Sequence, residues 1–132
     1  MEEALPTIRV VAAVIENNGK YLITQRRLDA AMPLLWEFPG GKVEPGEADA
    51  VALARELAER MAVGVHIGDE LFSVTREYDA YVIDFHVYLC RLLSETIRTL
   101  GIADYRWVDS DELDDFDFPA VDQDTVEALL QR

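Results

Sequence analysis

Residues 40–63 read GGKVEPGEADAVALARELAERMAV. Two adjacent glycines open this stretch, and the tripeptide Glu44-Pro45-Gly46 supplies a second turn. Residues 48–62 contain no glycine or proline and are rich in alanine and leucine, so they predict a helix. The order of these parts predicts a glycine turn that leads into a helix.

The predicted helix has two different faces. Leu53, Leu57 and Met61 recur at helical spacing and form an apolar stripe that can pack on a sheet. Glu56 and Glu59 are three residues apart and share another face. Two carboxylates and a backbone carbonyl of the glycine turn form a set of oxygen ligands suited to Mg²⁺. The alternative is an exposed helix face whose carboxylates make only ordinary ion pairs.

The composition bounds the class of protein. The chain has 132 residues, half of them apolar, and a formal net charge of −14. This length suits one compact core, so we expect a single domain over residues 1–132. No apolar run approaches the roughly 20 residues of a membrane helix, and we expect a cytoplasmic protein with no membrane partner.

The charge also bounds the class of ligand. Long nucleic acid is bound by basic side chains that replace counterions, so the acidic balance argues against such a partner. A small anionic ligand is compatible with this charge if a divalent cation, backbone amides or nearby basic residues assist its binding. The basic residues near the glycine turn are Arg26, Arg27 and Lys42.

The rest of the chain predicts short strands and one further helix. Residues 8–16 are rich in β-branched side chains, and the following Asn17-Asn18-Gly19 has the residues of a hairpin turn. We expect further strands at residues 21–25, 69–75, 81–92 and 105–108, a short extended segment at 36–38, loops at 28–35 and 76–80, a helical turn at 109–113, and a terminal helix at 121–130 with Val126, Leu129 and Leu130 facing inward. Hairpins combined with a helix between strands predict an α+β fold, with a mixed sheet packed between helices.

Other reactive residue types are expected to be structural. Cys90 has no partner for an internal disulfide and lies in an apolar strand, so we expect a buried small hydrophobe. His66 and His86 have no second ligand at metal-binding spacing. The acidic residues 109–124 lack the EF-hand pattern, and we expect a solvated acidic face there.

The spacing around Glu47 resembles a known signature. Gly41, five residues, Glu47, seven residues, Arg55-Glu56-Leu57, one residue and Glu59 is similar to the Nudix box, GX5EX7REUXEEXGU. Residues 34–47, LLWEFPGGKVEPGE, resemble more narrowly the MutT-type nucleoside triphosphate diphosphatases of that family. The resemblance extends over nearly the whole chain and implies a Nudix-type α/β/α sandwich.

This resemblance implies an activity and a catalytic set. The implied activity is hydrolysis of a nucleoside triphosphate to a nucleoside monophosphate and pyrophosphate, with Mg²⁺ or Mn²⁺ as cofactor. The implied metal ligands are the carbonyl of Gly40 and the carboxylates of Glu56 and Glu59. Glu47 and Arg55 would support the loop and orient these carboxylates.

The resemblance also implies contacts to a small-molecule nucleotide. Arg26 and Lys42 match basic positions that approach the substrate, and Phe38 would lie beside the base. Asp122 stands where MutT-type chains place a polar residue that reads the base edge. A carboxylate accepts hydrogen bonds, so it would favour N4 of cytosine or an N–H of a guanine edge, as in a cytidine triphosphate or an oxidised purine nucleotide. Capping of the final helix is the alternative role of Asp122.

Several positions depart from the family pattern. Arg60 replaces the second Glu of the EE pair, Ala62 replaces a Gly, and Gly101 stands where MutT-type chains place another Glu. Ala48 lacks the side-chain oxygen of a usual helix cap. Arg60 faces Glu56 at i+4, so we expect an ion pair there and weaker metal binding. The alternative to an active hydrolase, either as a monomer or as a homodimer, is therefore a catalytically weak or inactive Nudix domain that binds a nucleotide or a partner.

Overall fold

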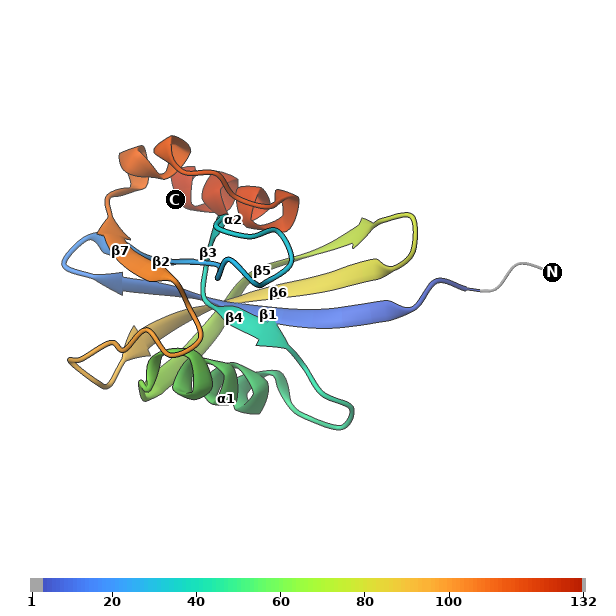
Figure 1. Cartoon of the computed structure of the whole chain (residues 1–132), viewed down its shortest axis with the longest axis horizontal. Helices are drawn as coiled ribbons and strands as arrows, with labels where there is room; N and C mark the ends of the chain where they lie inside the picture. The colour runs from blue at the N-terminus through green and yellow to red at the C-terminus, as the bar shows by residue number, and fades with distance from the viewer. Residues whose placement is uncertain (1–3, 132) are drawn as a thin grey trace.

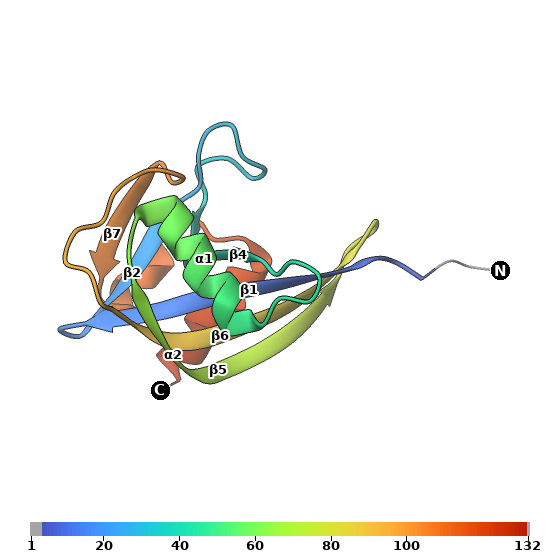
Figure 2. The ribbon, with the colours of Figure 1, turned by 90° about the horizontal axis from the view of Figure 1, so that it is seen from below.

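The computed structural model describes residues 4–131, which form a mixed sheet with helices on both faces (Figures 1 and 2). Its strands are β1 (Thr7–Asn17), β2 (Lys20–Gln25), β3 (Trp36–Glu37), β4 (Gly40–Lys42), β5 (Val65–Glu77), β6 (Val82–Leu92) and β7 (Asp104–Val108). Its helical elements are α1 (Asp49–Met61), the 3₁₀ helix η1 (Ser110–Asp115) and α2 (Ala120–Leu130). This architecture confirms the predicted α+β sandwich.

Strand β1 organises the sheet. The strand order is β3-β2-β1-β6-β5, with β4 paired to β1 and β7 paired to β2. The β1–β6 pair is parallel, whereas the other pairs are antiparallel. Residues Val10 to Ala12 of β1 pair with β4 on one side and β6 on the other. The prediction that Gly40 and Gly41 form a turn is wrong, because both residues pair with the buried strand β1 as part of β4. The turn lies after them at Glu44-Pro45-Gly46, as predicted, with Gly46 at a φ of 78°. The name glycine turn is kept below for residues 40–47.

Two apolar layers cover the two faces of the sheet. Below the sheet in Figure 1, α1 buries Leu53, Leu57 and Met61 completely, as the apolar stripe predicts. Above the sheet, η1 and α2 cover the other face, where the buried side chains are Leu113, Val126 and Leu129. The expected inward position of Leu130 is wrong. Its side chain is 49% exposed, because helix α2 already presents its neighbour Leu129 to the sheet.

Local backbone geometry explains where these elements turn. Asn18 and Gly19 have φ angles of 53° and 78°, which close the β1–β2 hairpin as predicted. Helix α1 ends at Ala62, whose φ of 56° is left-handed although the residue is not glycine. At the other end of α1, Ala48 makes no side-chain capping bond. The neighbouring Asp49 does not act as a substitute cap, since its carboxylate accepts hydrogen bonds from Arg9.

Strand β5 is longer than predicted. It runs over Val65–Glu77 instead of 69–75, and the hairpin loop to β6 lies at residues 78–81 instead of 76–80. Residues 65–67 pair with the end of β6, and the register then shifts between Ile67 and Glu70. This irregularity, together with the glycines at 64 and 68, breaks the alternation that indicates a strand in the sequence.

The remaining reactive side chains have structural surroundings. Cys90 is half-buried rather than fully buried, and burial raises the pKa of its thiol to about 12. His66 is exposed, while His86 lies between Glu70 and Asp84, at 2.6 Å and 2.8 Å. Both histidines therefore fit the expected structural or surface roles. Within residues 4–131, no helix combines the length and apolar character needed to cross a membrane.

Candidate active site

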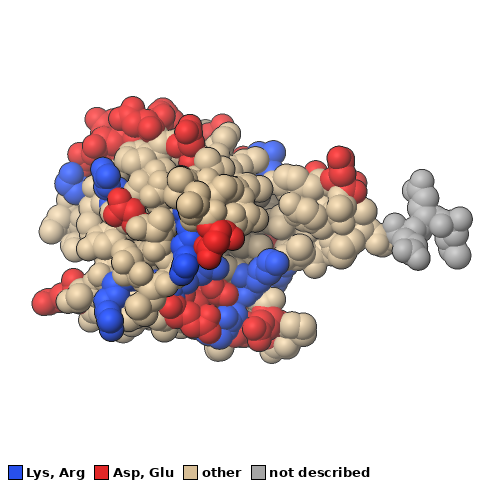
Figure 3. Space-filling view, viewed as in Figure 1, with Lys and Arg blue, Asp and Glu red and all other residues tan. Residues whose placement is uncertain are grey.

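A cavity of about 620 Å³ opens beside the glycine turn. Its charged lining side chains are Arg26, Glu37, Lys42, Glu44, Glu56 and Arg60, and the backbone of Gly40 and Gly41 also lines it. Its other lining side chains are mainly apolar or aromatic and include Val10, Phe38, Tyr78, Tyr81, Ile83, Phe85 and Val121, with the carboxyl of Asp122 among them. Figure 3 shows basic and acidic side chains next to each other near β4 and α1.

The two glycines of β4 are needed for close packing. A Cβ on Gly40 would lie 1.9 Å from the carbonyl oxygen of Val11. A Cβ on Gly41 would lie 2.3 Å from the carboxyl carbon of Glu56. The space that Gly41 leaves free is therefore filled by the carboxylate of Glu56, which brings helix α1 against the turn as the sequence predicts.

Arg55 connects the turn to the helix carboxylates. Its guanidinium donates hydrogen bonds to both oxygens of Glu47, at 2.8 Å and 2.9 Å, and to the carbonyl of Lys42 at 3.1 Å. A further hydrogen bond of 3.1 Å joins its Nη1 to Oε1 of Glu56. The hydrogen bond from Arg55 lowers the pKa of Glu47 to about 2.

Glu59 lies at the edge of this arrangement. Its carboxylate is 61% exposed and is 3.6 Å from Nη1 of Arg55, the same nitrogen that binds Glu56. The two carboxylates therefore converge on one guanidinium nitrogen. Glu59 does not line the cavity itself, so it approaches the site from the solvent side.

Arg60 occupies the inner side of Glu56. Its Nε donates a hydrogen bond of 2.9 Å to Oε2 of Glu56, which confirms the expected i+4 ion pair. Its Nη1 is 3.9 Å from Oε2 of Glu37. The backbone N–H of Gly101 donates to the carbonyl of Arg60 at 2.9 Å. Arg60 and Gly101, two of the departures from the family pattern, are thus in direct contact.

Glu37 is a cavity residue that the sequence reasoning missed. It accepts a hydrogen bond of 2.9 Å from Nη1 of Arg26, and burial raises the pKa of its carboxyl above the ordinary value. Arg26 also donates to the carbonyl of Ala31 at 2.6 Å. Strand β3 was predicted only as an extended segment, and nothing in the sequence indicates which face of it meets the glycine turn.

A buried carboxyl group lies among the lining residues of the cavity. Asp122 is 5% exposed and accepts a hydrogen bond of 3.1 Å from the backbone N–H of Phe38. Burial raises the pKa of Asp122 well above its usual value, and the nearby Glu37 adds to this effect. The cap of α2 is Pro119, so the alternative capping role of Asp122 does not describe this contact.

Aromatic side chains surround this carboxyl. The ring of Phe38 is 2% exposed and stacks on Phe118 with a centroid distance of 5.6 Å. Tyr78 and Tyr81 at the β5–β6 hairpin stack on each other at 5.1 Å and line the same cavity. Tyr78 lies in the segment predicted as a hairpin loop, and an aromatic pair beside a hairpin turn is a usable signal for such a position.

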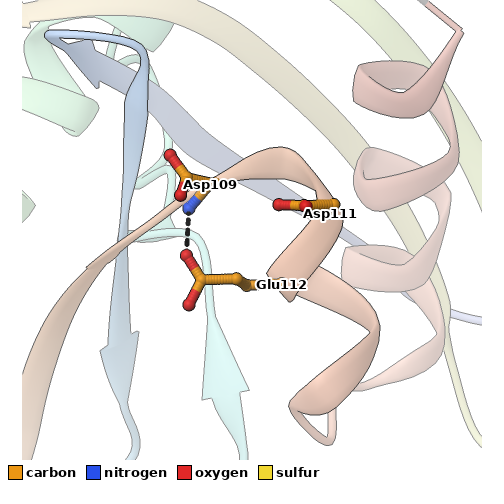
Figure 4. Close-up of side chains that lie close together, drawn as sticks. All are labelled: Asp109, Asp111 and Glu112. Atoms are coloured by element: carbon orange, nitrogen blue, oxygen red, sulfur yellow. Dashed lines mark hydrogen bonds between the residues drawn. The ribbon is translucent and has the colours of Figure 1, made fainter.

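A separate acidic group lies on η1. Asp109, Asp111 and Glu112 are exposed, and one carboxylate oxygen of each lies within 4.8 Å of the others (Figure 4). The backbone N–H of Asp109 donates to Glu112 at 2.9 Å, an arrangement that caps the start of η1. These residues do not line the cavity, and they belong to the expected acidic face.

A family model described as NUDIX domain matches residues 10–128 of the chain. The chain belongs to the Nudix family. Members of this family generally use divalent metal ions. The oxygen atoms of Gly40, Glu56 and Glu59 are hard donors of the kind that such ions prefer, but both oxygens of Glu56 already bind guanidinium groups.

Named Nudix relatives agree with this assignment. The chain is 43% identical over 81 residues to the CTP pyrophosphohydrolase of Escherichia coli strain K12, a match that covers 61% of this chain and 60% of that protein. It is 34% identical over 126 residues to the 8-oxo-dGTP diphosphatase of Haemophilus influenzae, which covers 93% of this chain and 91% of that protein.

Solved structures give the same fold. The E. coli ORF135 protein matches with a TM-score of 0.82 at 32% identity, over 96% of this chain and 91% of that one. The MutT protein from Methanosarcina mazei Go1 matches with a TM-score of 0.83 at 25% identity, over 96% of this chain and 94% of that one. The predicted resemblance to MutT-type Nudix hydrolases is therefore confirmed.

Proposed function

We propose that this protein is a metal-dependent nucleoside triphosphate diphosphatase. The reaction consumes one water molecule, breaks one phosphoanhydride bond and releases a nucleoside monophosphate and pyrophosphate. The names of two relatives, a CTP pyrophosphohydrolase and an 8-oxo-dGTP diphosphatase, support this class of substrate.

The cavity is lined by two kinds of group, charged and aromatic, and this is the observation that carries the proposal. A nucleotide also has two parts, a flat apolar base and a charged phosphate chain. The aromatic side chains of Tyr78 and Tyr81, with Asp122, suit the base, whereas the charged groups beside Gly41 suit the phosphates. Arg26 and Lys42 line the same cavity, which supports their proposed contacts with the phosphates.

The buried carboxyl of Asp122 favours a cytosine base. A raised pKa keeps the proton on a carboxyl group to a higher pH, and a protonated carboxyl both donates and accepts hydrogen bonds. Cytosine presents a complementary edge, since its N3 accepts and its N4 amino group donates. An ionised carboxylate only accepts hydrogen bonds and would instead suit the N–H groups of an oxidised guanine.

The residues proposed for catalysis lie in the cavity or directly beside it. Gly40, Glu56 and Glu59 would hold Mg²⁺ or Mn²⁺, which supplies charge neutralisation on the phosphates and activation of the attacking water when bound. Arg55 and Glu47 keep Glu56 against the glycine turn. This positioning matters because catalytic groups must be held in place before the substrate arrives.

Pyrophosphate release from a panel of ordinary and oxidised nucleoside triphosphates tests the activity. We expect metal-dependent release, with the fastest turnover for a cytidine triphosphate, and a large loss in Glu56→Gln. Glu95→Gln removes the same charge from an exposed position outside the cavity and serves as the control. Absence of turnover with every nucleotide would contradict the proposal.

The contact between Arg60 and Glu56 favours one alternative, a nucleotide-binding domain with little or no turnover. In that case nucleotides would stabilise the folded protein whether or not a divalent metal is present. Thermal unfolding with each nucleotide, with and without Mg²⁺, distinguishes the alternative from a metal-dependent enzyme.

A further inference from the structure

Arg55 and Arg60 both bind Glu56, but they are anchored to different degrees. Arg55 makes three additional hydrogen bonds, to Glu47 and to the carbonyl of Lys42. Across residues 4–131, the Arg60 side chain makes a single hydrogen bond, the one to Glu56. Its contact with Glu37 is a longer ion pair of 3.9 Å. Arg60 is therefore the guanidinium that can leave Glu56 more easily.

The position of Arg60 makes its free N–H groups relevant to an anionic ligand. The side chain lines the cavity beside Glu56 and is 33% exposed. Arg26, which also lines the cavity, is already bound to Glu37 and to the carbonyl of Ala31. The planar guanidinium of Arg60 suits bidentate binding of phosphate oxygens.

The surroundings of Arg60 are shaped for this side chain. A Cβ on Gly101 would lie 3.2 Å from both Cα and Cγ of Arg60, closer than ordinary van der Waals contact. The N–H groups of Leu100 and Gly101 both donate to the Arg60 carbonyl, at 3.1 Å and 2.9 Å. The loop before β7 thus holds the backbone of Arg60 and leaves room for its stem, while the guanidinium is held by the hydrogen bond to Glu56 and the longer ion pair with Glu37.

From these contacts, and on the basis of the proposed function, we infer that Arg60 alternates between two partners. Without nucleotide and metal, it neutralises Glu56. When a divalent ion takes the Glu56 carboxylate, the guanidinium turns to a phosphate oxygen of the substrate. Arg60 thus competes with metal for Glu56 but assists nucleotide binding, because two cations repel each other near one carboxylate while both attract phosphate.

The test is the substitution Arg60→Gln, examined in the full chain by two binding measurements. Mn²⁺ binding without nucleotide, followed by electron paramagnetic resonance, should become about tenfold tighter because a competing cation is removed. Binding of a non-hydrolysable triphosphate analogue at saturating Mn²⁺, followed by calorimetry, should become about 10- to 100-fold weaker because a charged hydrogen bond is lost. A purely structural role would not move the two affinities in opposite directions.

Arg91→Gln is the matched control, since it removes the same charge from an exposed residue outside the cavity. Arg60→Lys keeps the charge and should leave Mn²⁺ binding close to that of the wild type, which also guards against a folding defect in Arg60→Gln. Mn²⁺ binding in Arg60→Gln that is no tighter than in Arg91→Gln would overturn the competition. Unchanged analogue binding would overturn the phosphate contact. Both measurements report binding and do not depend on turnover. Turnover by the wild-type protein is measured separately, so a failure of the proposed hydrolase activity is not confused with a failure of the Arg60 proposal.

Discussion

The carboxyl group of Asp122 on α2 accepts a hydrogen bond of 3.1 Å from the backbone N–H of Phe38, just after β3. This contact joins the helix above the sheet to the chain that enters the glycine turn. It also places a titratable group, almost without solvent contact, in the lining of the cavity. Under the proposed function, one side chain would therefore affect both the stability of the fold and the choice of base.

Asp122→Asn should make stability less dependent on pH. A carboxyl whose pKa is raised on folding contributes stability that is fully present below the unfolded value of 3.8 and is lost as the pH rises through the folded pKa. Asparagine keeps an oxygen for the Phe38 N–H but carries no charge. As the pH is raised above 3.8, the melting temperature of the variant should therefore increase relative to that of the wild type. A difference in melting temperature that stays constant with pH would contradict the raised pKa of Asp122.

The same substitution should change the ranking of bases in the nucleotide panel. Asparagine offers an amide donor that cannot ionise, so the preference between cytosine and an oxidised guanine should stop varying with pH. Wild-type preference should shift from cytosine towards guanine as Asp122 ionises. An identical ranking in both proteins at every pH would remove Asp122 from base recognition.

Tyr78 and Tyr81 should supply stacking energy to the base. Replacing either with alanine should weaken nucleotide binding by about 5- to 100-fold, since loss of an aromatic platform costs about 1–3 kcal/mol per stacked base. Phenylalanine at the same positions keeps the ring and should preserve the affinity. Equal loss in the alanine and phenylalanine variants, measured by calorimetry, would exclude stacking as the main contribution.

Gly41→Ala should displace Glu56. The added Cβ would fall 2.3 Å from the Glu56 carboxyl carbon, so the carboxylate must leave its place beside the turn. We expect kcat/KM to fall by about 100-fold, the usual scale for misplacing a catalytic group by about 1 Å. Gly64→Ala is the control because its new Cβ would meet its nearest neighbours at 3.7 Å. Full activity of a folded Gly41→Ala protein would contradict the role given to Glu56.

Glu47→Gln should reduce activity by about 10- to 100-fold by loosening Arg55, and hence Glu56. Asp29→Asn breaks the exposed ion pair with Arg27 and should leave activity unchanged.

The pair of Glu47 and Arg55 should also make stability depend on pH. Because Arg55 lowers the pKa of Glu47 to about 2, the wild-type pair should stabilise the fold above the ordinary Glu pKa of 4.5 and lose this contribution as the pH falls through about 2. Between pH 4.5 and about 2, the stability of Glu47→Gln should therefore fall less steeply than that of the wild type in an acid-unfolding experiment.

Local patterns were sufficient for most of the secondary structure. The Asn18-Gly19 turn and helix α1 follow from backbone preferences and helical spacing, which act over a few residues. The predictions were wrong where contacts between residues far apart in the sequence determine the structure. The early start of β5 depends on pairing with the end of β6, and the exposure of Leu130 depends on how α2 rotates against the sheet. Patterns over a few neighbouring residues do not predict either of these interactions.

The sequence by itself determined the Nudix assignment, the α+β class and the i+4 contact between Arg60 and Glu56, because these depend on residue identity and short-range spacing. Only the tertiary structure decided that Glu37 and the Tyr78–Tyr81 pair line the cavity, that Asp122 is buried against Phe38, and that Gly101 lies against Arg60. Each of these contacts joins segments far apart in the chain. These contacts depend on how the sheet and its two helical layers pack, so they cannot be predicted from spacing along the sequence.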